Sequence, residues 1–171
     1  MKLSTRATIS LATPFAVLLA IALARPAVAG LDEGKAAFER GDYETAMREL
    51  LPLAEQGVSE AQLGVGVMYA NGQGVAQNPA DAAKWFREAA EQGHAQAQFN
   101  LASMYSVGRG VAQDNVLAYM WCTVSANSTP AGEMRDRAAQ RCDRLAPRLS
   151  SRELAKAKEL ASKFVPRSER P

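Results

Sequence analysis

The sequence predicts an all-α fold: a right-handed solenoid of helix pairs with C-terminal capping helices. The stretch that begins at Ala61 returns 36 positions later at Ala97, with 12 of 33 aligned residues identical. Each copy carries apolar residues at the i, i+3, i+4, i+7 spacing of an amphipathic helix. A Gly-x-Gly pair, at 72–74 and again at 108–110, separates the two helices of each copy. A fixed period of this length is typical of units that bury their apolar faces by stacking on one another.

Residues 1–29 have the features of a secretory leader. A short basic start precedes an apolar stretch over residues 7–24, and Ala27-Val28-Ala29 matches the small-x-small site of signal peptidase. We therefore expect cleavage after Ala29 and a periplasmic or secreted protein. The apolar stretch is at the short end for a bilayer span, so an uncleaved membrane anchor is the alternative.

The charge of the chain changes when the leader is removed. The full sequence has 20 basic and 18 acidic residues, and the leader contains three of the bases and none of the acids. The mature chain would therefore be close to neutral, which does not favour nucleic acid as a partner. No second long apolar run follows residue 30, so we expect no membrane span after leader removal.

The helix pairs can be assigned in order along the chain. Residues 30–57 form the first pair, which has a short turn at Gly41-Asp42-Tyr43 in place of the Gly-x-Gly loop. Residues 58–93 form the second pair. Its first helix ends at Gly72, because glycine adopts a positive φ, and its second begins with Asn78 as N-cap and Pro79 as first helical residue. Residues 94–129 repeat this arrangement, with Asp114 as the N-cap.

The repeat ends near residue 129, and residues 130–165 are expected to form the capping helices. The first runs from about Glu133 to Ala146, where Pro147 stops it. A capping box formed by Ser150 and Glu153 begins the second. Residues 166–171 are expected to form a disordered tail.

Two units share a specific pattern: Met-Tyr, then Gly-x-Gly-Val, then Ala-x-x-Trp. This pattern resembles the Sel-one-like repeat (SLR), a 36-residue relative of the tetratricopeptide repeat, in a bacterial exported member. Residues 31–57 look more like a plain tetratricopeptide unit. The resemblance implies a scaffold for protein–protein interaction that binds an envelope protein or peptide in a concave groove, without catalysis. The residues that carry it are Ala61, Met68, Tyr69, Gly72, Gly74, Val75, Ala82 and Trp85, and Ala97, Met104, Tyr105, Gly108, Gly110, Val111, Ala118 and Trp121.

Matching the units to the repeat pattern assigns the side chains of the groove, since the first helix of each unit lines the inner face in such solenoids. Several of these positions are apolar although stacking of units does not require it, which indicates a site for a peptide or a helix. Packing between units is the alternative use for them. The expected partner-binding residues are Glu60, Leu63, Val67, Ala70 and Asn71, followed by Gln96, Phe99, Ser103, Ser106 and Val107.

The two cysteines follow the leader, and each lies on the inward face of a predicted helix. Cys122 belongs to the last repeat and Cys142 to the first capping helix. Because an exported protein meets an oxidising compartment, we expect a disulfide that ties the capping helices to the last repeat. Two buried free thiols are the alternative.

The sequence offers little catalytic chemistry. His94 is the one histidine, it lies in a turn between units, and no Gly-x-Ser-x-Gly elbow is present. The Gly-x-Gly pairs follow helices, whereas a dinucleotide-binding loop follows a strand. We therefore expect no catalytic residue, no metal and no cofactor. An envelope hydrolase of the β-lactamase or penicillin-binding type is the least favoured alternative.

Arginines recur at positions 137, 141, 144 and 148, and the first three line one side of the first capping helix. One interpretation is a basic patch for an anionic envelope polymer or a lipid head group. The interpretation that we favour is a solvated face whose aliphatic stems pack along the edge of the core. A protein that binds cell-wall fragments or polysaccharide is accordingly the alternative function.

Overall fold

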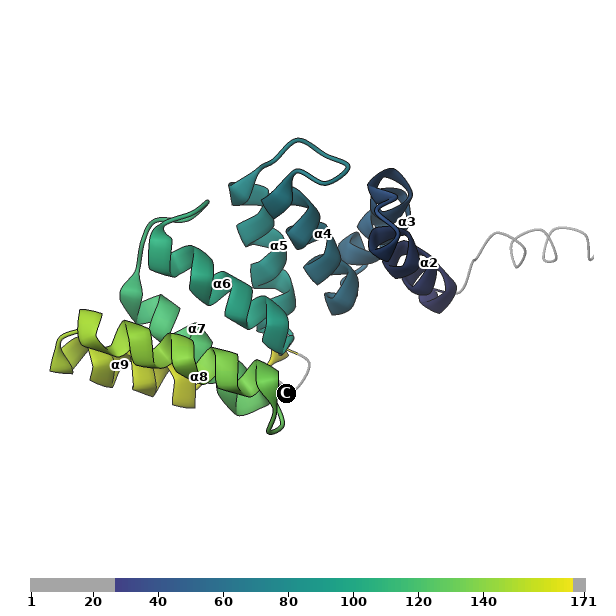
Figure 1. Cartoon of the computed structure of the whole chain (residues 1–171). Coiled ribbons are helices and arrows are strands. Elements are labelled where there is room, and N and C mark those ends of the chain that lie inside the picture. The colour runs from purple at the N-terminus through teal and green to yellow at the C-terminus, as the bar shows by residue number, and fades with distance from the viewer. Residues whose placement is uncertain (1–26, 168–171) are drawn as a thin grey trace, which may run out of the picture.

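The computed structural model describes residues 27–167, which form α-helices stacked in successive pairs and contain no strand. Figure 1 shows the pairs side by side, from α2 and α3 at one end to α8 and α9 at the other. The expected all-α solenoid is therefore confirmed. The helices are α2 (Ala27–Glu39), α3 (Tyr43–Glu55), α4 (Ser59–Asn71), α5 (Pro79–Glu91), α6 (Ala95–Val107), α7 (Asn115–Ser128), α8 (Glu133–Leu145) and α9 (Ser151–Ser162).

The expected leader lies almost entirely outside the described residues. Helix α2 begins at Ala27, so the expected cleavage site after Ala29 falls within its first turn. No helix in the described range is long and apolar enough to cross a bilayer.

The helix ends follow the expected capping residues. Asn78 Oδ1 accepts the backbone N–H of Ala80 at 3.1 Å, and Asp114 accepts that of Leu117 at 2.9 Å. Ser150 opens α9 with both hydrogen bonds of a capping box. Helix α8 ends at Leu145, and Pro147 lies in the single 3₁₀ turn that follows.

The glycines of the Gly-x-Gly loops have two different roles. Gly72 ends α4 with a φ of 71°, as the sequence predicts. Gly110, the second glycine of the later pair, packs against the preceding unit. A Cβ on Gly110 would lie 2.1 Å from the carbonyl oxygen of Pro79, and one on Gly74 would lie 2.6 Å from that of Tyr43. Each loop therefore touches the first turn of the preceding unit's second helix, and only glycine allows this approach.

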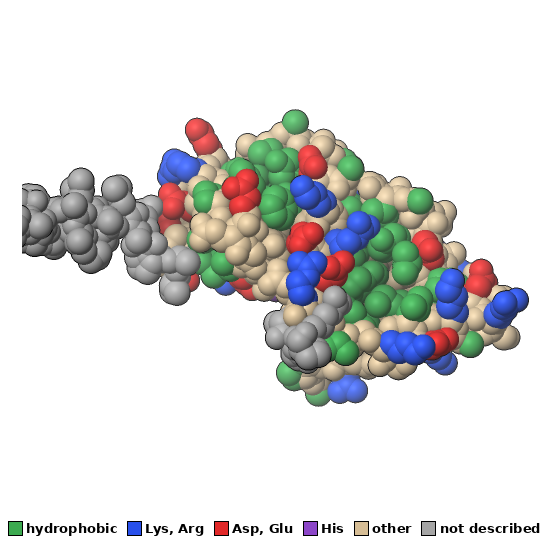
Figure 2. All heavy atoms as spheres, turned by 180° about the vertical axis from the view of Figure 1, so that it is seen from behind, with side chains coloured by type: hydrophobic (Ala, Val, Ile, Leu, Met, Phe, Trp, Pro, Cys, Tyr) green, Lys and Arg blue, Asp and Glu red, His purple; other side chains and the backbone are tan. Residues whose placement is uncertain are grey.

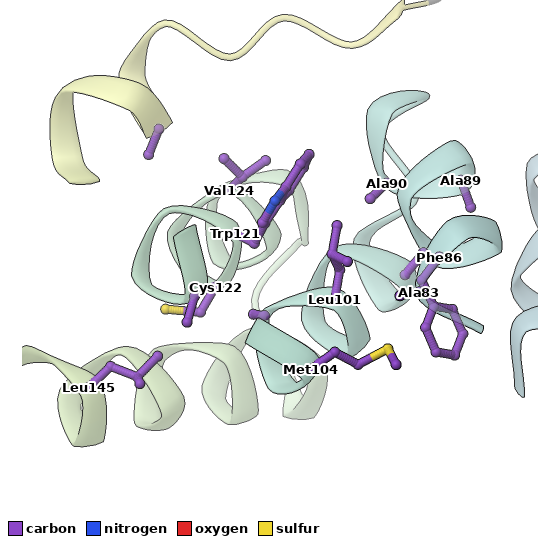
Figure 3. Close-up of a cluster of buried hydrophobic side chains, with 14 of the residues drawn as sticks. Ala83, Phe86, Ala89, Ala90, Leu101, Met104, Trp121, Cys122, Val124 and Leu145 are labelled. Carbon is purple, nitrogen blue, oxygen red and sulfur yellow. The ribbon is translucent and has the colours of Figure 1, made fainter. Parts of the chain in front are cut away.

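The core is continuous across the last two repeats and the cap. Phe86 of α5, Leu101 of α6 and Cys122 of α7 belong to one buried cluster (Figure 3). Buried glutamines close the turns between units: Gln62 and Gln98 donate to the carbonyl oxygens of Ala54 and Ala90, each at 3.1 Å. Each glutamine adds a side-chain donor to a helix-end carbonyl that also accepts the backbone N–H of the following glycine, Gly57 or Gly93, at 3.0 Å.

The cap is fixed to the last repeat at several points. Cys122 and Cys142 form a disulfide between α7 and α8, as expected. Phe164, after α9, packs edge-to-face on Trp121 with ring centroids 5.3 Å apart. Arg167, in the segment expected to be a disordered tail, lies against α5 and pairs with two glutamates there, Glu88 and Glu91.

Candidate functional site

Two cavities lie between the first helices of successive units. The distal cavity, of about 340 Å³, is lined by Val67, Ala70, Asn71, Phe86, Asn100, Ser103, Met104, Val107 and Arg109. The proximal cavity, of about 180 Å³, is lined by Lys35, Phe38, Glu39, Leu50, Glu60, Leu63, Gly64 and Val67. Val67 lines both cavities, so they adjoin, and together we call them the inner groove.

Most of the expected partner-binding residues line this groove. Glu60, Leu63 and Val67 lie at the proximal cavity. Ala70, Asn71, Ser103 and Val107 lie at the distal cavity, together with Val67. Gln96, Phe99 and Ser106 line neither cavity. Gln96 donates to Asn100 Oδ1 at 3.0 Å, and Ser106 is buried with its hydroxyl donating to Ser103 O at 2.8 Å.

Phe99 is covered by the chain itself rather than open to a partner. It is 7% exposed. The guanidinium carbon of Arg141, on α8, lies 4.2 Å from the ring centroid of Phe99, and that of Arg137 lies 5.3 Å away. Both distances are within the range of cation–π attraction. Phe99 is therefore used in packing within the chain, and the contacts over its ring come from the capping helix α8, whereas the sequence had offered packing between units as the alternative.

The four arginines at 137, 141, 144 and 148 differ in their environment, and Arg148 lies in the 3₁₀ turn after α8. The stem of Arg141 is half-buried, its Nη1 donates to Ser103 Oγ at 3.0 Å, and its Nε is buried without a hydrogen-bond partner. Burial, together with the like charges of Arg144 and Arg137, lowers the pKa of Arg141. Arg144 and Arg148 are exposed. Arg137 is also exposed, although it contacts the ring of Phe99, so Arg141 alone of the four is partly buried at the edge of the groove.

Arg109 is a groove residue that the sequence analysis missed. Its Nη2 donates to the carbonyl oxygen of Ala70 at 2.6 Å, at the C-terminal end of α4. Gln77 donates to the same oxygen at 2.9 Å. A cation is favourable there, because the last carbonyls of a helix carry partial negative charge. The only available signal was the middle residue of the Gly-x-Gly loop, which is glutamine in one unit and arginine in the next.

The rim of the proximal cavity holds a chain of polar contacts across three units. Glu60 accepts from Lys35 Nζ at 3.1 Å, and its other carboxylate oxygen lies 3.0 Å from His94 Nε2. The hydrogen bond with His94, and then that with Lys35, lowers the pKa of Glu60. His94 therefore joins the start of α6 to the start of α4. Within residues 27–167 no group of three or more His, Cys, Asp or Glu side chains could hold a metal ion.

The charges of the groove are uneven along its length. Helices α6 and α7 carry no charged residue. At the distal end, Arg109, Arg137 and Arg141 have no ion pair with any acidic residue in the described part of the chain. On the face opposite that in Figure 1, basic and acidic side chains are interspersed between hydrophobic patches (Figure 2).

Comparison with known proteins agrees with the repeat pattern. A family model described as Sel1 repeat matches residues 59–94 and 95–128, within one residue of the units assigned from the sequence. A crystal structure of c5321, a protective antigen of uropathogenic Escherichia coli strains with an SLR fold, superposes with a TM-score of 0.75 over 84% of this chain at 28% identity. A Sel1 repeat protein from Oxalobacter formigenes gives 0.61 over 77%, also at 28% identity.

This chain spans 30% of the length of the first of these proteins and 54% of the second. No curated protein matches the chain.

Proposed function

We propose that this Sel1-repeat protein is an exported scaffold that binds a protein partner of the cell envelope in the inner groove, without catalysis. The observation that carries the proposal is the pair of adjoining cavities that meet at Val67. Proteins built from Sel1 repeats mediate protein interactions, and an exposed concave surface is where helical solenoids bind their partners.

Val107 marks the rim of the groove as an apolar contact surface. It is 65% exposed, and the other large hydrophobic side chains exposed in the described range are Leu160 and Val165. Met104 and Phe86, which belong to the buried cluster of Figure 3, also line the same cavity. A partner that covers Val107 would remove this surface from water, which is the main driving force of association.

Two features support export. A disulfide joins α7 to α8, and such bonds persist in oxidising compartments. The first 29 residues have the pattern of a secretory leader. Together they favour a periplasmic or secreted location.

The proposal involves no covalent step. His94, the natural choice for a general base, has the Glu60 carboxylate as its side-chain partner, and no serine or threonine hydroxyl is hydrogen-bonded to its ring in the described structure. A second candidate function, binding of an anionic cell-wall fragment or polysaccharide, is favoured by the guanidinium groups of Arg137 and Arg141 beside the groove, which form no ion pair within residues 27–167.

The proposal is tested by replacing Val107 with aspartate. Affinity capture from a periplasmic extract would compare the wild type, Val107→Asp and the matched control Leu160→Asp, an exposed apolar residue on α9. Losing the burial of one valine and desolvating a carboxylate weakens binding about tenfold or more. We expect the same protein to be captured by the wild type and the control, and to be lost with Val107→Asp. Equal capture by all three would contradict the proposal.

Replacement of Phe99 is not a suitable test, because its ring lies beneath Arg141. A change there would disturb the packing of α8 on α6. Val107 is preferable because its side chain is exposed and its substitution leaves the core unchanged.

A further inference from the structure

We propose that the distal end of the inner groove binds an acidic side chain of the partner, so that the bound segment is a peptide with an aspartate or glutamate next to an apolar residue. This inference rests on the proposed function and specifies its ligand. It places the apolar residue of the peptide against Val107 and its carboxylate at the guanidinium groups of Arg137 and Arg141.

The first argument is unmatched positive charge. Arg137 and Arg141 lie one helical turn apart on the same side of α8, and Arg109 approaches the distal cavity from the other side. None of the three has an acidic partner within residues 27–167, and the neighbouring helices α6 and α7 carry no charge. Guanidinium groups favour carboxylates because their planar donors match both carboxylate oxygens.

The acidic residues of α8 do not neutralise this positive charge. Because successive residues of an α-helix are rotated by about 100°, Asp136 and Asp143 lie on a different side of α8 from Arg137 and Arg141. Glu133 lies one turn before Arg137 on the same side, is exposed and forms no ion pair with a described residue. The arginines therefore outnumber the acids at this end of the groove.

The second argument is that Arg141 is held in place. Arg141 stacks on Phe99 and donates to Ser103, a residue that lines the distal cavity. Arg137 shares the same aromatic ring. Because the stacking and the hydrogen bond restrain Arg141 before a ligand arrives, less conformational entropy is lost on binding.

The opposite end of the groove sets the orientation of the peptide. At the proximal cavity, Glu60 already engages Lys35 and His94, while Glu39 has no ion pair with a described residue. This end therefore does not attract a carboxylate. The acidic residue of the peptide is expected at the distal end only.

The lining of the distal cavity favours a peptide over a sugar polymer. Its walls combine aliphatic side chains with the polar residues Asn71, Asn100 and Ser103, and its one aromatic side chain, Phe86, is 3% exposed. Phe99 nearby is covered by α8. The cavity therefore offers no open aromatic face on which a sugar ring could stack, whereas an apolar side chain beside a carboxylate matches both the walls and the charge.

The test is a selection of random peptides displayed on phage against the disulfide-bonded protein. We compare the wild type, Arg137→Glu and the matched control Arg135→Glu. Arg135 is an exposed arginine two positions away on α8, so it points to nearly the opposite side. The wild type and the control are expected to enrich peptides with an acidic residue beside an apolar one, and Arg137→Glu is expected to lose the acidic preference.

A double-mutant cycle with one selected peptide makes the test quantitative. Arg137→Glu is expected to weaken binding of the synthetic peptide about five- to tenfold, since partly exposed ion pairs contribute modestly and charge reversal adds repulsion. Replacing the acidic residue of the peptide with its amide should weaken binding to the wild type and have little effect on Arg137→Glu. Arg141→Gln keeps a hydrogen-bond donor for Ser103 and serves as a second variant. Circular dichroism checks that its fold is undisturbed.

The outcomes separate this inference from the proposed function. Selected peptides that lack acidic enrichment, but lose binding with Val107→Asp, would overturn the acidic site and leave the groove as the binding surface. Peptides that bind Val107→Asp as well as the wild type would overturn both. A third outcome is that no peptide is selected, while the wild type binds oligogalacturonate and Arg137→Glu does not. This result would overturn both the acidic-peptide site and the protein-binding groove in favour of an anionic polysaccharide.

Discussion

Replacing Gly110 with alanine tests whether the second glycine of the Gly-x-Gly loop sets the contact between units. Gly110 has a φ of +71°, and a Cβ there would lie 2.1 Å from the carbonyl oxygen of Pro79. That oxygen belongs to the backbone of the preceding unit's second helix, so it cannot rotate away. Alanine at this position therefore requires the two units to move apart.

The expected loss can be estimated from two contributions. An alanine at positive φ costs about 1 kcal/mol relative to glycine. Forcing an extra methyl group into a close contact costs about 1–3 kcal/mol more. Gly41→Ala is the matched control, because Gly41 has a φ of +79° but no atom within 4 Å of the point that a Cβ would occupy. We expect a total loss of about 2–4 kcal/mol for Gly110→Ala and about 1 kcal/mol for Gly41→Ala.

The assay is urea unfolding of each purified variant, followed by circular dichroism. Unfolding free energies are compared only where the dependence on urea, the m-value, is unchanged. Gly57→Ala repeats the control, since its φ is +91° and its Cβ position is also open. If Gly110→Ala lost no more stability than the two controls, the close approach of the units would not be a determinant of stacking.

Two further predictions concern the cap and the groove rim. Reduction of the disulfide, which closes a loop of 20 residues, should lower the unfolding free energy by about 3 kcal/mol, and Cys142→Ser should lower it by the same amount. Mass spectrometry should show a gain of two hydrogens on reduction. The pKa of Glu60 is lowered in the fold by its hydrogen bond with His94 and then by that with Lys35. These contacts of the carboxylate therefore stabilise the protein at neutral pH, and their contribution is lost as the pH falls below the ordinary value of 4.5. The stability difference between wild type and Glu60→Gln in urea titrations should therefore shrink on acidification; a constant difference from neutral pH to acid would contradict this assignment.

The helix ends and turns could be predicted from the sequence because they depend on local chemistry. Asn78 and Asp114 accept backbone N–H groups within the next three residues, and Gly72 adopts the positive φ that ends its helix. The disulfide could also be predicted, because helical spacing placed both cysteines on inward faces of adjacent helices. In each case the partner lies nearby in the chain or on the next helix.

The groove was predicted only in part. Val67 and Val107 line the cavities as expected. Phe99 has the same apolar character as they do, but α8 covers it. Arg109 was missed because its partner, the carbonyl of Ala70, lies 39 positions away in the preceding unit. Helical periodicity identifies which face a side chain occupies, but not which distant helix lies over that face.

The sequence by itself determined the repeat, the helix boundaries and the positions that face inward, because caps, glycine turns and apolar spacing act over a few residues. Only the tertiary structure decided which part of that inward face stays open. Helix α8 lies across Phe99 because the cap packs on α7 and is joined to it by the disulfide. That placement depends on how whole helices pack, and it also brings Arg137 and Arg141 to the edge of the groove.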